Sequence, residues 1–263
     1  MRALRGFGYV SVGVAASLGL LIGSAPASAE ALVRFPSAGD SIQGYLTKPK
    51  GAGPFPAVVL LHSCLGLPAN RRAMADAFAG WGYVALFVDD FTTRGVKETC
   101  AVDFPAALPD ALGALAYASR LPYVDPARIA AIGFSQGADT ALKIASSRPA
   151  AASGGADDPR FKAAAAFYPP CENEANARLE IPTLILVGAM DDVTPAADCA
   201  GLAARQPGST VKLVVYPRAR HGFDNPEFAD GKRLFGMWLA YDRDAAERSR
   251  AELREFLAAR LAQ

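Results

Sequence analysis

Histidine is scarce in this chain, since only His62 and His221 occur among its 263 residues. A zinc site with three histidine ligands is therefore excluded, and a histidine that acts as a general base has to be one of these two. The sequence also lacks an excess of either charge, with 27 basic and 26 acidic residues. This balance provides no electrostatic footprint for nucleic acid, so we expect no nucleic-acid partner.

Charged residues are absent from position 6 to position 29. This stretch follows two arginines, is largely apolar between Phe7 and Ile22, and ends in Ala27-Ser28-Ala29. These features are typical of a secretory signal peptide, and the apolar run is too short and too rich in Gly and Ser for a good membrane span. An uncleaved N-terminal anchor is the alternative. We predict residues 1–29 to be a signal peptide and the mature protein to be periplasmic or secreted, without stable membrane insertion.

The mature chain, residues 30–263, contains no repeat or low-complexity tract and is predicted to be one domain. Apolar runs typical of buried parallel strands alternate with segments of helical spacing, and one early segment has the alternation of an antiparallel strand. The strand-like segments are 41–47, 56–62, 83–89, 128–133, 161–168, 183–188 and 211–216, and the helix-like segments are 69–80, 106–120, 136–147, 195–205 and 245–261. This order predicts an α/β fold, with helices on both faces of a doubly wound, mostly parallel sheet.

Cysteine is also sparse, and none of the four cysteines shows C-x-x-C spacing. Metal clips and thioredoxin-type redox pairs are therefore weak interpretations. In an oxidising compartment an even number of cysteines permits disulfides. We favour the pairs Cys64–Cys100 and Cys171–Cys199, because each would join loops that the predicted fold brings together. Four buried thiols are the alternative.

A candidate nucleophile follows the strand predicted at 128–133. The sequence Gly133-Phe134-Ser135-Gln136-Gly137 runs from this strand into a helix, which is the context of a nucleophile elbow. The glycines allow a sharp turn that leaves no room for a Cβ atom, and Ser135 then points its hydroxyl toward the helix N-terminus. The alternative is a serine that merely caps the helix.

A serine hydroxyl needs a base to remove its proton. We prefer His221, which lies in the loop after the strand 211–216 and fits the chain order serine, acid, histidine. His62 follows the strand 56–62 at the same edge of the sheet, and we interpret it as a residue that shapes the adjacent loop.

The acid of such a triad is expected after the strand 183–188, where Asp191 and Asp192 stand side by side. A carboxylate here would accept the imidazole N–H and stabilise the imidazolium. Asp191 is preferred because it comes first after the strand, while Asp192 is a candidate to cap the helix that begins near Pro195. Asp224 is a third and more distant candidate.

An oxyanion hole requires two N–H donors. We expect one from Gln136, directly after the nucleophile, and the other from the loop after the strand 56–62, with the amide of Cys64 preferred.

The sequence resembles the dienelactone hydrolase family of the α/β-hydrolase fold over roughly residues 35–260. The resemblance rests on the histidine loop after PAVVLLH, on DDFTTRG at 89–95, on GFSQG, on GAMDDVTP and on YPRARHGF. It implies that Ser135, Asp191 and His221 occupy the triad positions and that Cys64 and Gln136 supply the oxyanion amides. It also implies that Arg94 meets a substrate carboxylate; an ion pair of Arg94 with Asp89 or Asp90 is the alternative.

Two features differ from the family pattern. The namesake enzymes use a cysteine nucleophile where this chain has Ser135, and they carry a glutamate after the loop histidine where this chain has Ser63. Both differences favour a plain serine hydrolase over a true dienelactone hydrolase. Phe134 is the candidate substrate-binding aromatic residue, and other aromatic candidates for an acyl pocket are Trp81, Phe91, Tyr168 and Phe223.

The sequence therefore predicts an exported serine hydrolase that cleaves a small-molecule substrate, a carboxylic ester or lactone, through an acyl-enzyme, with no metal or organic cofactor. A peptidase or an acyltransferase would use the same triad, and a non-catalytic binding protein of the same fold is the alternative from another class. The sequence does not indicate an oligomeric state.

Overall fold

The computed structural model describes residue 1 and residues 29–262, apart from 103, 105, 148–157 and 209. Residues 2–28, which form almost all of the predicted signal peptide, lie outside the described residues. Within the part of the chain that is described, no helix is long and apolar enough to cross a membrane.

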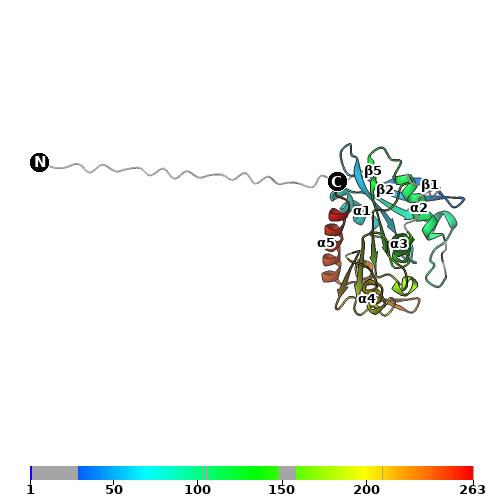
Figure 1. Ribbon diagram of the computed structural model, residues 1–263, viewed down its shortest axis with the longest axis vertical. Helices are drawn as coiled ribbons and strands as arrows, with labels where there is room; N and C mark the ends of the chain where they lie inside the picture. The colour runs from blue at the N-terminus through cyan, green and yellow to red at the C-terminus, as the bar shows by residue number, and fades with distance from the viewer. Residues whose placement is uncertain (2–28, 103, 105, 148–157, 209, 263) are drawn as a thin grey trace.

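An eight-stranded sheet runs through the centre of the molecule (Figure 1). Its strands lie in the order β1-β2-β4-β3-β5-β6-β7-β8, with antiparallel pairing only at β1–β2 and β2–β4 and parallel pairing elsewhere. The strands are β1 (Ala31–Ser37), β2 (Asp40–Thr47), β3 (Phe55–Leu61), β4 (Val84–Asp89), β5 (Val124–Phe134), β6 (Ala163–Phe167), β7 (Thr183–Gly188) and β8 (Val211–Tyr216). The predicted fold class is confirmed, and β1 is the strand of this sheet that the prediction lacks.

Helices cover both faces of the sheet, as a doubly wound fold requires. Apolar residues of α1 and α5 pack into one buried cluster, and those of α2, α3 and α4 pack into the cluster on the opposite face. Figure 1 shows α1 and α5 on one side of the sheet and α2 and α3 on the other. The helices are α1 (Arg71–Gly80), α2 (Ala107–Ala118), α3 (Gln136–Ser147), α4 (Ala196–Ala204) and α5 (Arg243–Arg260).

Three inner strands, β4, β6 and β7, are buried along their whole length because helices cover both of their faces. Every residue of β6 and of β7 is buried, which explains their continuous apolar sequences. At the C-terminal end of the chain, Asp242 caps α5 by accepting a hydrogen bond from the N–H of Ala245 at 3.0 Å. That helix turns Leu253, Phe256 and Leu257 toward the sheet, as its spacing predicts.

Four parallel strands end at one edge of the sheet and bring their following loops together. Leu61 at the end of β3 lies opposite Gly133 in β5, and Gly188 at the end of β7 lies opposite Tyr216 in β8. Ligands bind to folds of this kind at the carboxyl ends of the strands. The candidate residues at positions 62–64, 135, 191 and 221 all follow these strand ends.

Two disulfides, Cys64–Cys100 and Cys171–Cys199, pair all four cysteines. Both are the pairs that the sequence favours. The alternative of four free thiols is wrong, because each cysteine is in a disulfide.

Candidate active site

Ser135 occupies the turn between β5 and α3 in a strained backbone conformation. Its φ angle is +52°, in the left-handed region that a residue with a side chain seldom adopts. The turn is tight because a Cβ atom added to Gly133 would lie 2.0 Å from the carbonyl oxygen of Gly137, and one added to Gly137 would lie 2.3 Å from the carbonyl oxygen of Leu61. Both glycines are therefore required for the turn that presents the Ser135 hydroxyl at the end of the helix.

A hydrogen-bonded row connects the three side chains that the sequence singles out. His221 Nε2 lies 2.9 Å from Ser135 Oγ, and His221 Nδ1 lies 2.9 Å from Asp191 Oδ2. His221 and Asp191 are both buried, and the Tyr168 ring packs edge-on against the imidazole at a centroid distance of 4.6 Å. With Nδ1 bonded to the carboxylate, Nε2 is left to accept the serine proton, as a general base must.

Asp191 is held as an anion by the groups around it. Burial raises the pKa of this carboxyl, but the hydrogen bond and charge of His221 and the backbone N–H groups of Thr194 and Val193 outweigh burial, so its pKa is below the ordinary value. Its Oδ1 accepts both backbone N–H groups at 2.9 Å, and its Oδ2 accepts the Thr194 hydroxyl at 3.0 Å. The expectation that Asp192 caps α4 is wrong, because Pro195 is the N-cap residue and no side chain caps the helix.

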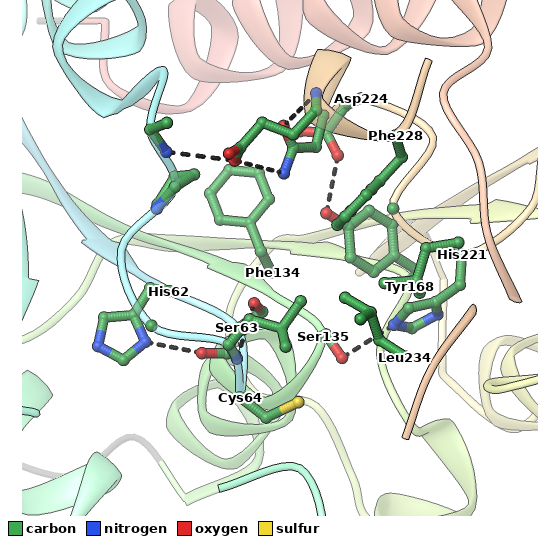
Figure 2. Close-up of a pocket in the computed structure, with 18 of the residues that line it drawn as sticks. His62, Ser63, Cys64, Phe134, Ser135, Tyr168, His221, Asp224, Phe228 and Leu234 are labelled. Atoms are coloured by element: carbon green, nitrogen blue, oxygen red, sulfur yellow. Dashed lines mark hydrogen bonds between the residues drawn. The ribbon is translucent and has the colours of Figure 1, made fainter. Parts of the chain in front are cut away.

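Asp224, the third candidate acid, forms its side-chain hydrogen bond with Tyr168 and not with His221. It accepts the hydroxyl of Tyr168 at 2.7 Å (Figure 2). Burial raises the pKa of this carboxyl above its ordinary value. Burial and the neighbouring Asp224 also raise the pKa of Tyr168 well above its ordinary value, so its hydroxyl keeps its proton and donates it to this hydrogen bond.

Two backbone N–H groups beside Ser135 are available as donors. The N–H of Cys64, in the loop after β3, and the N–H of Gln136, the first residue of α3, donate no hydrogen bond that is found among the described residues. Cys64 lies beside Ser135 in the lining of two neighbouring cavities, and Gln136 lines one of them. Unpaired amides at a helix N-terminus and at a neighbouring strand end suit a developing negative charge.

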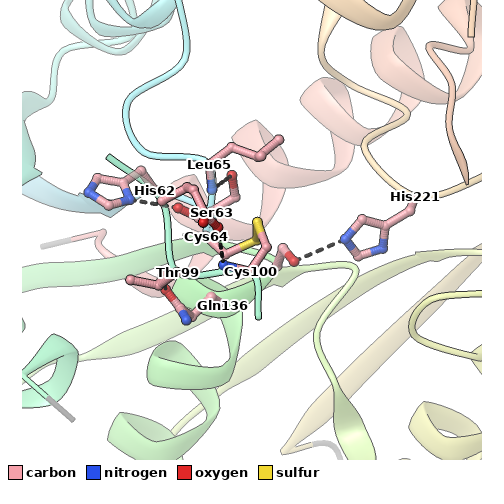
Figure 3. The surroundings of a disulfide bond; sticks show 10 residues. His62, Ser63, Cys64, Leu65, Thr99, Cys100, Gln136 and His221 are labelled. Carbon is pink, nitrogen blue, oxygen red and sulfur yellow. Dashed lines mark hydrogen bonds between the residues drawn. A yellow bond between two sulfur atoms is a disulfide. The ribbon is translucent and has the colours of Figure 1, made fainter. Parts of the chain in front are cut away.

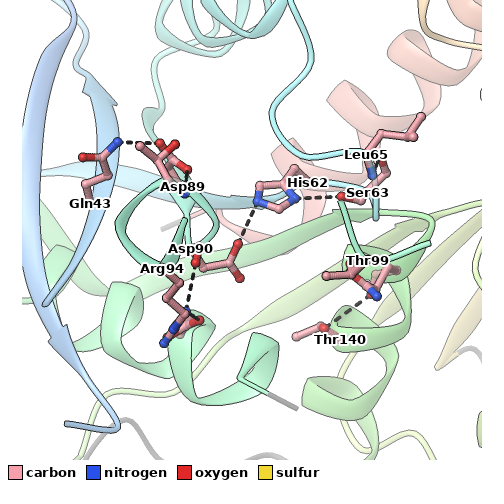
Figure 4. A network of polar contacts seen from close by, with 12 residues as sticks. Gln43, His62, Ser63, Leu65, Asp89, Asp90, Arg94, Thr99 and Thr140 are labelled. Carbon is pink, nitrogen blue, oxygen red and sulfur yellow. Dashed lines mark hydrogen bonds and ion pairs between the residues drawn. The ribbon is translucent and has the colours of Figure 1, made fainter. Parts of the chain in front are cut away.

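The His62 ring points away from Ser135 (Figure 2) and belongs to a polar network with Ser63 and Asp90 (Figure 4). Its Nδ1 lies 2.8 Å from the carbonyl oxygen of Ser63, and its Nε2 lies 2.7 Å from Asp90 Oδ1. Burial lowers the pKa of this imidazole, but the hydrogen bond and charge of Asp90 outweigh it, so the pKa is raised. With an acceptor at each ring nitrogen, His62 is suited to the doubly protonated form.

Arg94, expected either to meet a substrate carboxylate or to pair with Asp89 or Asp90, has other partners. Its guanidinium forms ion pairs with Asp110 at 2.7 Å and with Asp40 at 2.8 Å, and it also donates to the backbone carbonyl of Asp90. The hydrogen bond to Asp110 raises the pKa of Arg94 above its ordinary value despite partial burial. Arg94 lines neither cavity at Ser135.

Two cavities meet at Ser135. The first has a volume of about 360 Å³ and is mostly apolar, and Figure 2 shows residues that line it. The second has a volume of about 500 Å³ and lies on the side of Gln136. Among the aromatic candidates, Phe134 and Tyr168 line the first cavity, whereas Trp81, Phe91 and Phe223 line neither.

A small hairpin that the sequence does not predict completes this region. Strands β9 (Lys232–Leu234) and β10 (Met237–Leu239) form it, and three apolar residues of the hairpin, Leu234, Met237 and Leu239, line the first cavity. The backbone of His221 pairs with Leu239 in a β-bridge, and its carbonyl accepts the N–H of Ala240 at 3.1 Å. The hairpin therefore both encloses the cavity and holds the loop that carries the imidazole.

Comparison with known proteins identifies the family. The family model described as the dienelactone hydrolase family matches residues 42–261. The chain belongs to the dienelactone hydrolase family. A protein of Methylorubrum extorquens with the provisional name carboxymethylenebutenolidase is 28% identical over 206 residues, which span 73% of this chain and 71% of that protein. Cutinase 1 of Thermobifida cellulosilytica is 26% identical over 154 residues, which span 59% of this chain and 55% of the cutinase.

Among solved structures, a provisional dienelactone hydrolase of Klebsiella pneumoniae has the same fold. The two share 22% sequence identity with a TM-score of 0.70, over 88% of this chain and 98% of that one. Family and relatives together identify this dienelactone hydrolase family member as a carboxylic-ester hydrolase.

Proposed function

We propose that this chain is an exported serine hydrolase that cleaves small carboxylic esters or lactones through an acyl-enzyme on Ser135. The observation that carries the proposal is the row of hydrogen bonds from Ser135 through His221 to the buried Asp191, at the mouth of a mostly apolar cavity. A serine, a base and an orienting acid in this arrangement are the requirements for acyl transfer.

In the proposed reaction, the Ser135 hydroxyl attacks the substrate carbonyl while His221 Nε2 takes its proton. The oxygen of the tetrahedral intermediate becomes negative and receives hydrogen bonds from the N–H groups of Cys64 and Gln136. His221 then gives the proton to the leaving alcohol, and the acyl group remains on Ser135. Water attacks this ester with His221 again as base, which releases the acid and restores the serine. Throughout, Asp191 stabilises the imidazolium.

The charges around Ser135 favour substrates that carry no carboxylate. Asp224 and Glu227 line the first cavity, and the lysine there, Lys232, is exposed to solvent. In the second cavity, Lys143 forms an ion pair with Asp139 at 2.7 Å. Among the described residues that line the two cavities, no buried, unpaired cation would offset these acids against a substrate carboxylate. We therefore propose neutral esters and lactones as the preferred substrates.

Ester hydrolysis by Ser135→Ala tests the proposal. A panel of p-nitrophenyl esters of increasing acyl length, with one lactone included, should be cleaved by the unchanged protein. With the variant, kcat should fall by a factor of about 10³ or more, because no nucleophile remains. The matched control is Ser41→Ala at an exposed position of β2, which should hydrolyse the panel normally. An active Ser135→Ala protein, or an unchanged protein without activity, would contradict the proposal.

Export is part of the same proposal and has a separate test. The two disulfides support it, because disulfides persist in oxidising compartments. We expect the exported protein to begin at Glu30, so N-terminal sequencing of protein recovered outside the cytoplasm should read Glu-Ala-Leu-Val. An N-terminus at Met1 in that fraction would contradict signal-peptide cleavage.

A further inference from the structure

The Cys64–Cys100 disulfide is attached directly to a proposed oxyanion donor, because the amide of Cys64 and its sulfur belong to the same residue. We propose that this disulfide is a positioning element of the active site: it fixes the Cys64 N–H at the distance and direction that the negative oxygen of the intermediate requires. This inference rests on the proposed function of Ser135. It assigns to Cys100 a role in the reaction that is distinct from global stability.

The loop that carries the Cys64 amide has few other constraints of its own. It consists of a short turn after β3 in which the carbonyl of Ser63 accepts hydrogen bonds from His62 Nδ1 at 2.8 Å and from the N–H of Gly66 at 3.0 Å. In a planar trans peptide, the N–H of Cys64 points opposite to the Ser63 carbonyl. Together with the hydrogen bond from the N–H of Leu65 to Ser63 Oγ at 3.3 Å, these bonds set the plane of the donor amide. They all lie within the turn, so none of them joins the turn to the segment on the other side of Cys64.

The segment around Cys100 provides the attachment on that side (Figure 3). The N–H of Thr99 donates to the carbonyl of Cys64 at 2.9 Å, and the disulfide joins the next residue to the Cys64 side chain. The hydroxyl of Thr99 donates to the side-chain Oε1 of Gln136 at 2.8 Å. Thr99 and Cys100 thus contact both residues whose amides form the proposed oxyanion hole.

This attachment depends on the covalent bond because residues 96–101 form no helix or strand. A segment without a hydrogen-bonded ladder opens locally at low free energy. If the disulfide is absent, the hydrogen bonds found among the described residues between this segment and the two donor residues are that from the N–H of Thr99 to Cys64 and that from the Thr99 hydroxyl to Gln136. Small displacements of an oxyanion donor have large effects on rate, because the hydrogen bond strengthens mainly in the transition state.

The second disulfide is a matched control. Cys171–Cys199 joins the 3₁₀ turn η2 (Cys171–Glu174) to α4, and neither of its cysteines lines a cavity at Ser135. The two disulfides close loops of similar length, with sequence separations of 36 and 28 residues. Since disulfide stabilisation depends on loop length only slowly, removal of either pair should reduce global stability by a similar amount.

The experiment compares two double variants, Cys64→Ser with Cys100→Ser and Cys171→Ser with Cys199→Ser. Serine retains the backbone N–H at position 64 and leaves no reactive thiol beside Ser135. We expect the first variant to lose about tenfold or more in kcat for a p-nitrophenyl ester with KM changed much less, and to lose a similar factor in the rate of fluorophosphonate labelling. The control should show a comparable fall in melting temperature with kcat within about twofold of the unchanged protein.

Either of two outcomes with the double variants would overturn the inference. One is a folded Cys64→Ser, Cys100→Ser protein with normal kcat, and the other is an equal loss of kcat in the control, which would mean that stability alone is responsible. If the first variant does not fold, the folded Cys171→Ser, Cys199→Ser protein is treated with a phosphine reductant, which opens its remaining disulfide, Cys64–Cys100. We expect kcat to fall on reduction and to return on reoxidation. An unchanged kcat after complete reduction would reject the inference. A failure of the proposed function is distinguishable, because the unchanged protein would then lack esterase activity.

Discussion

At the scale of single residues, the two histidines differ in what their ring nitrogens face. Both ring nitrogens of His62 lie against acceptors, the Ser63 carbonyl and the Asp90 carboxylate. In His221, one nitrogen faces the Asp191 carboxylate and the other faces a hydroxyl, which is able to donate. The first environment retains a proton on each nitrogen, and the second leaves one nitrogen free to accept a proton. The surroundings therefore support a base role for His221 and a structural role for His62.

The two neighbouring aspartates provide a test of the acid. Asp191 is buried and bonded to His221, whereas Asp192 is exposed. We expect Asp191→Asn to lower kcat by a factor of about 10⁴, because an amide neither fixes the working tautomer nor stabilises the imidazolium. Asp192→Asn should stay within about twofold in the same p-nitrophenyl ester assay. Equal losses in the two variants would contradict the assignment.

His62 should contribute stability in a pH-dependent way. Its pKa is raised in the folded protein above the ordinary value of 6.5 by Asp90, and Asp89 adds a smaller charge effect, although burial acts in the opposite direction. A group with a raised pKa in the folded state stabilises it fully below the unfolded pKa and loses this contribution as the pH rises through the folded pKa.

The melting temperature of the unchanged protein should therefore exceed that of His62→Gln most at about pH 5.5 to 6.5, and the difference should decrease toward pH 9. A difference that grows with pH would show that His62 is neutral in the folded protein. Thermal unfolding of both proteins at several pH values measures this difference in melting temperature.

At the scale of elements, the turn between β5 and α3 is set by close backbone approach. Gly137→Ala would bring a Cβ atom to 2.3 Å from the carbonyl oxygen of Leu61, and backbone atoms on both sides cannot give way. We expect a loss of about 1–3 kcal/mol in the free energy of unfolding, together with lower esterase activity. Gly80→Ala, in α1 with open space around its Cβ position, should instead stabilise by about 0.5–1 kcal/mol. Urea denaturation measures the free energy of unfolding of both variants. An unchanged free energy of unfolding in Gly137→Ala would contradict the prediction.

Prediction from sequence succeeded for elements that have a strong local signal. The buried strands have continuous apolar runs and α5 has a regular apolar side, so their predicted bounds lie close to the observed ones, except that β5 begins four residues earlier than predicted, at Val124. The β9–β10 hairpin has strands of only three residues, and its position depends on pairing with the His221 loop, which no local pattern indicates.

Side-chain partners were harder to predict than strands. Arg94 pairs with Asp40 and Asp110, which lie 54 and 16 residues away in the sequence, and Tyr168 pairs with Asp224 at a separation of 56 residues. Tertiary packing sets such contacts, and composition or spacing does not encode them. The residues proposed for catalysis are easier to find because each lies in the loop that follows a strand end, where the topology of a parallel sheet gathers side chains.

At the scale of the whole molecule, charge around the cavities should determine which esters are accepted. The acids Asp224 and Glu227 line the first cavity, and the guanidinium of Arg94 is held elsewhere by two ion pairs. We expect p-nitrophenyl butyrate to be hydrolysed with kcat/KM about tenfold or more above that of mono-p-nitrophenyl succinate, which bears a carboxylate at the end of its acyl chain. Added salt should reduce the ratio of the two kcat/KM values, because it screens the repulsion between the substrate carboxylate and these acids. Equal or better hydrolysis of the succinate would contradict a preference for neutral substrates.

The central claim is that Ser135 is the nucleophile, and covalent labelling tests it most directly. The folded mature protein is treated with a fluorophosphonate probe, digested, and the adduct located by mass spectrometry. We predict one adduct, on Ser135 in the peptide that contains Gly-Phe-Ser-Gln-Gly, and no adduct after heat denaturation or in Ser135→Ala. Labelling of the native protein at another residue, or no labelling at all, would contradict the account.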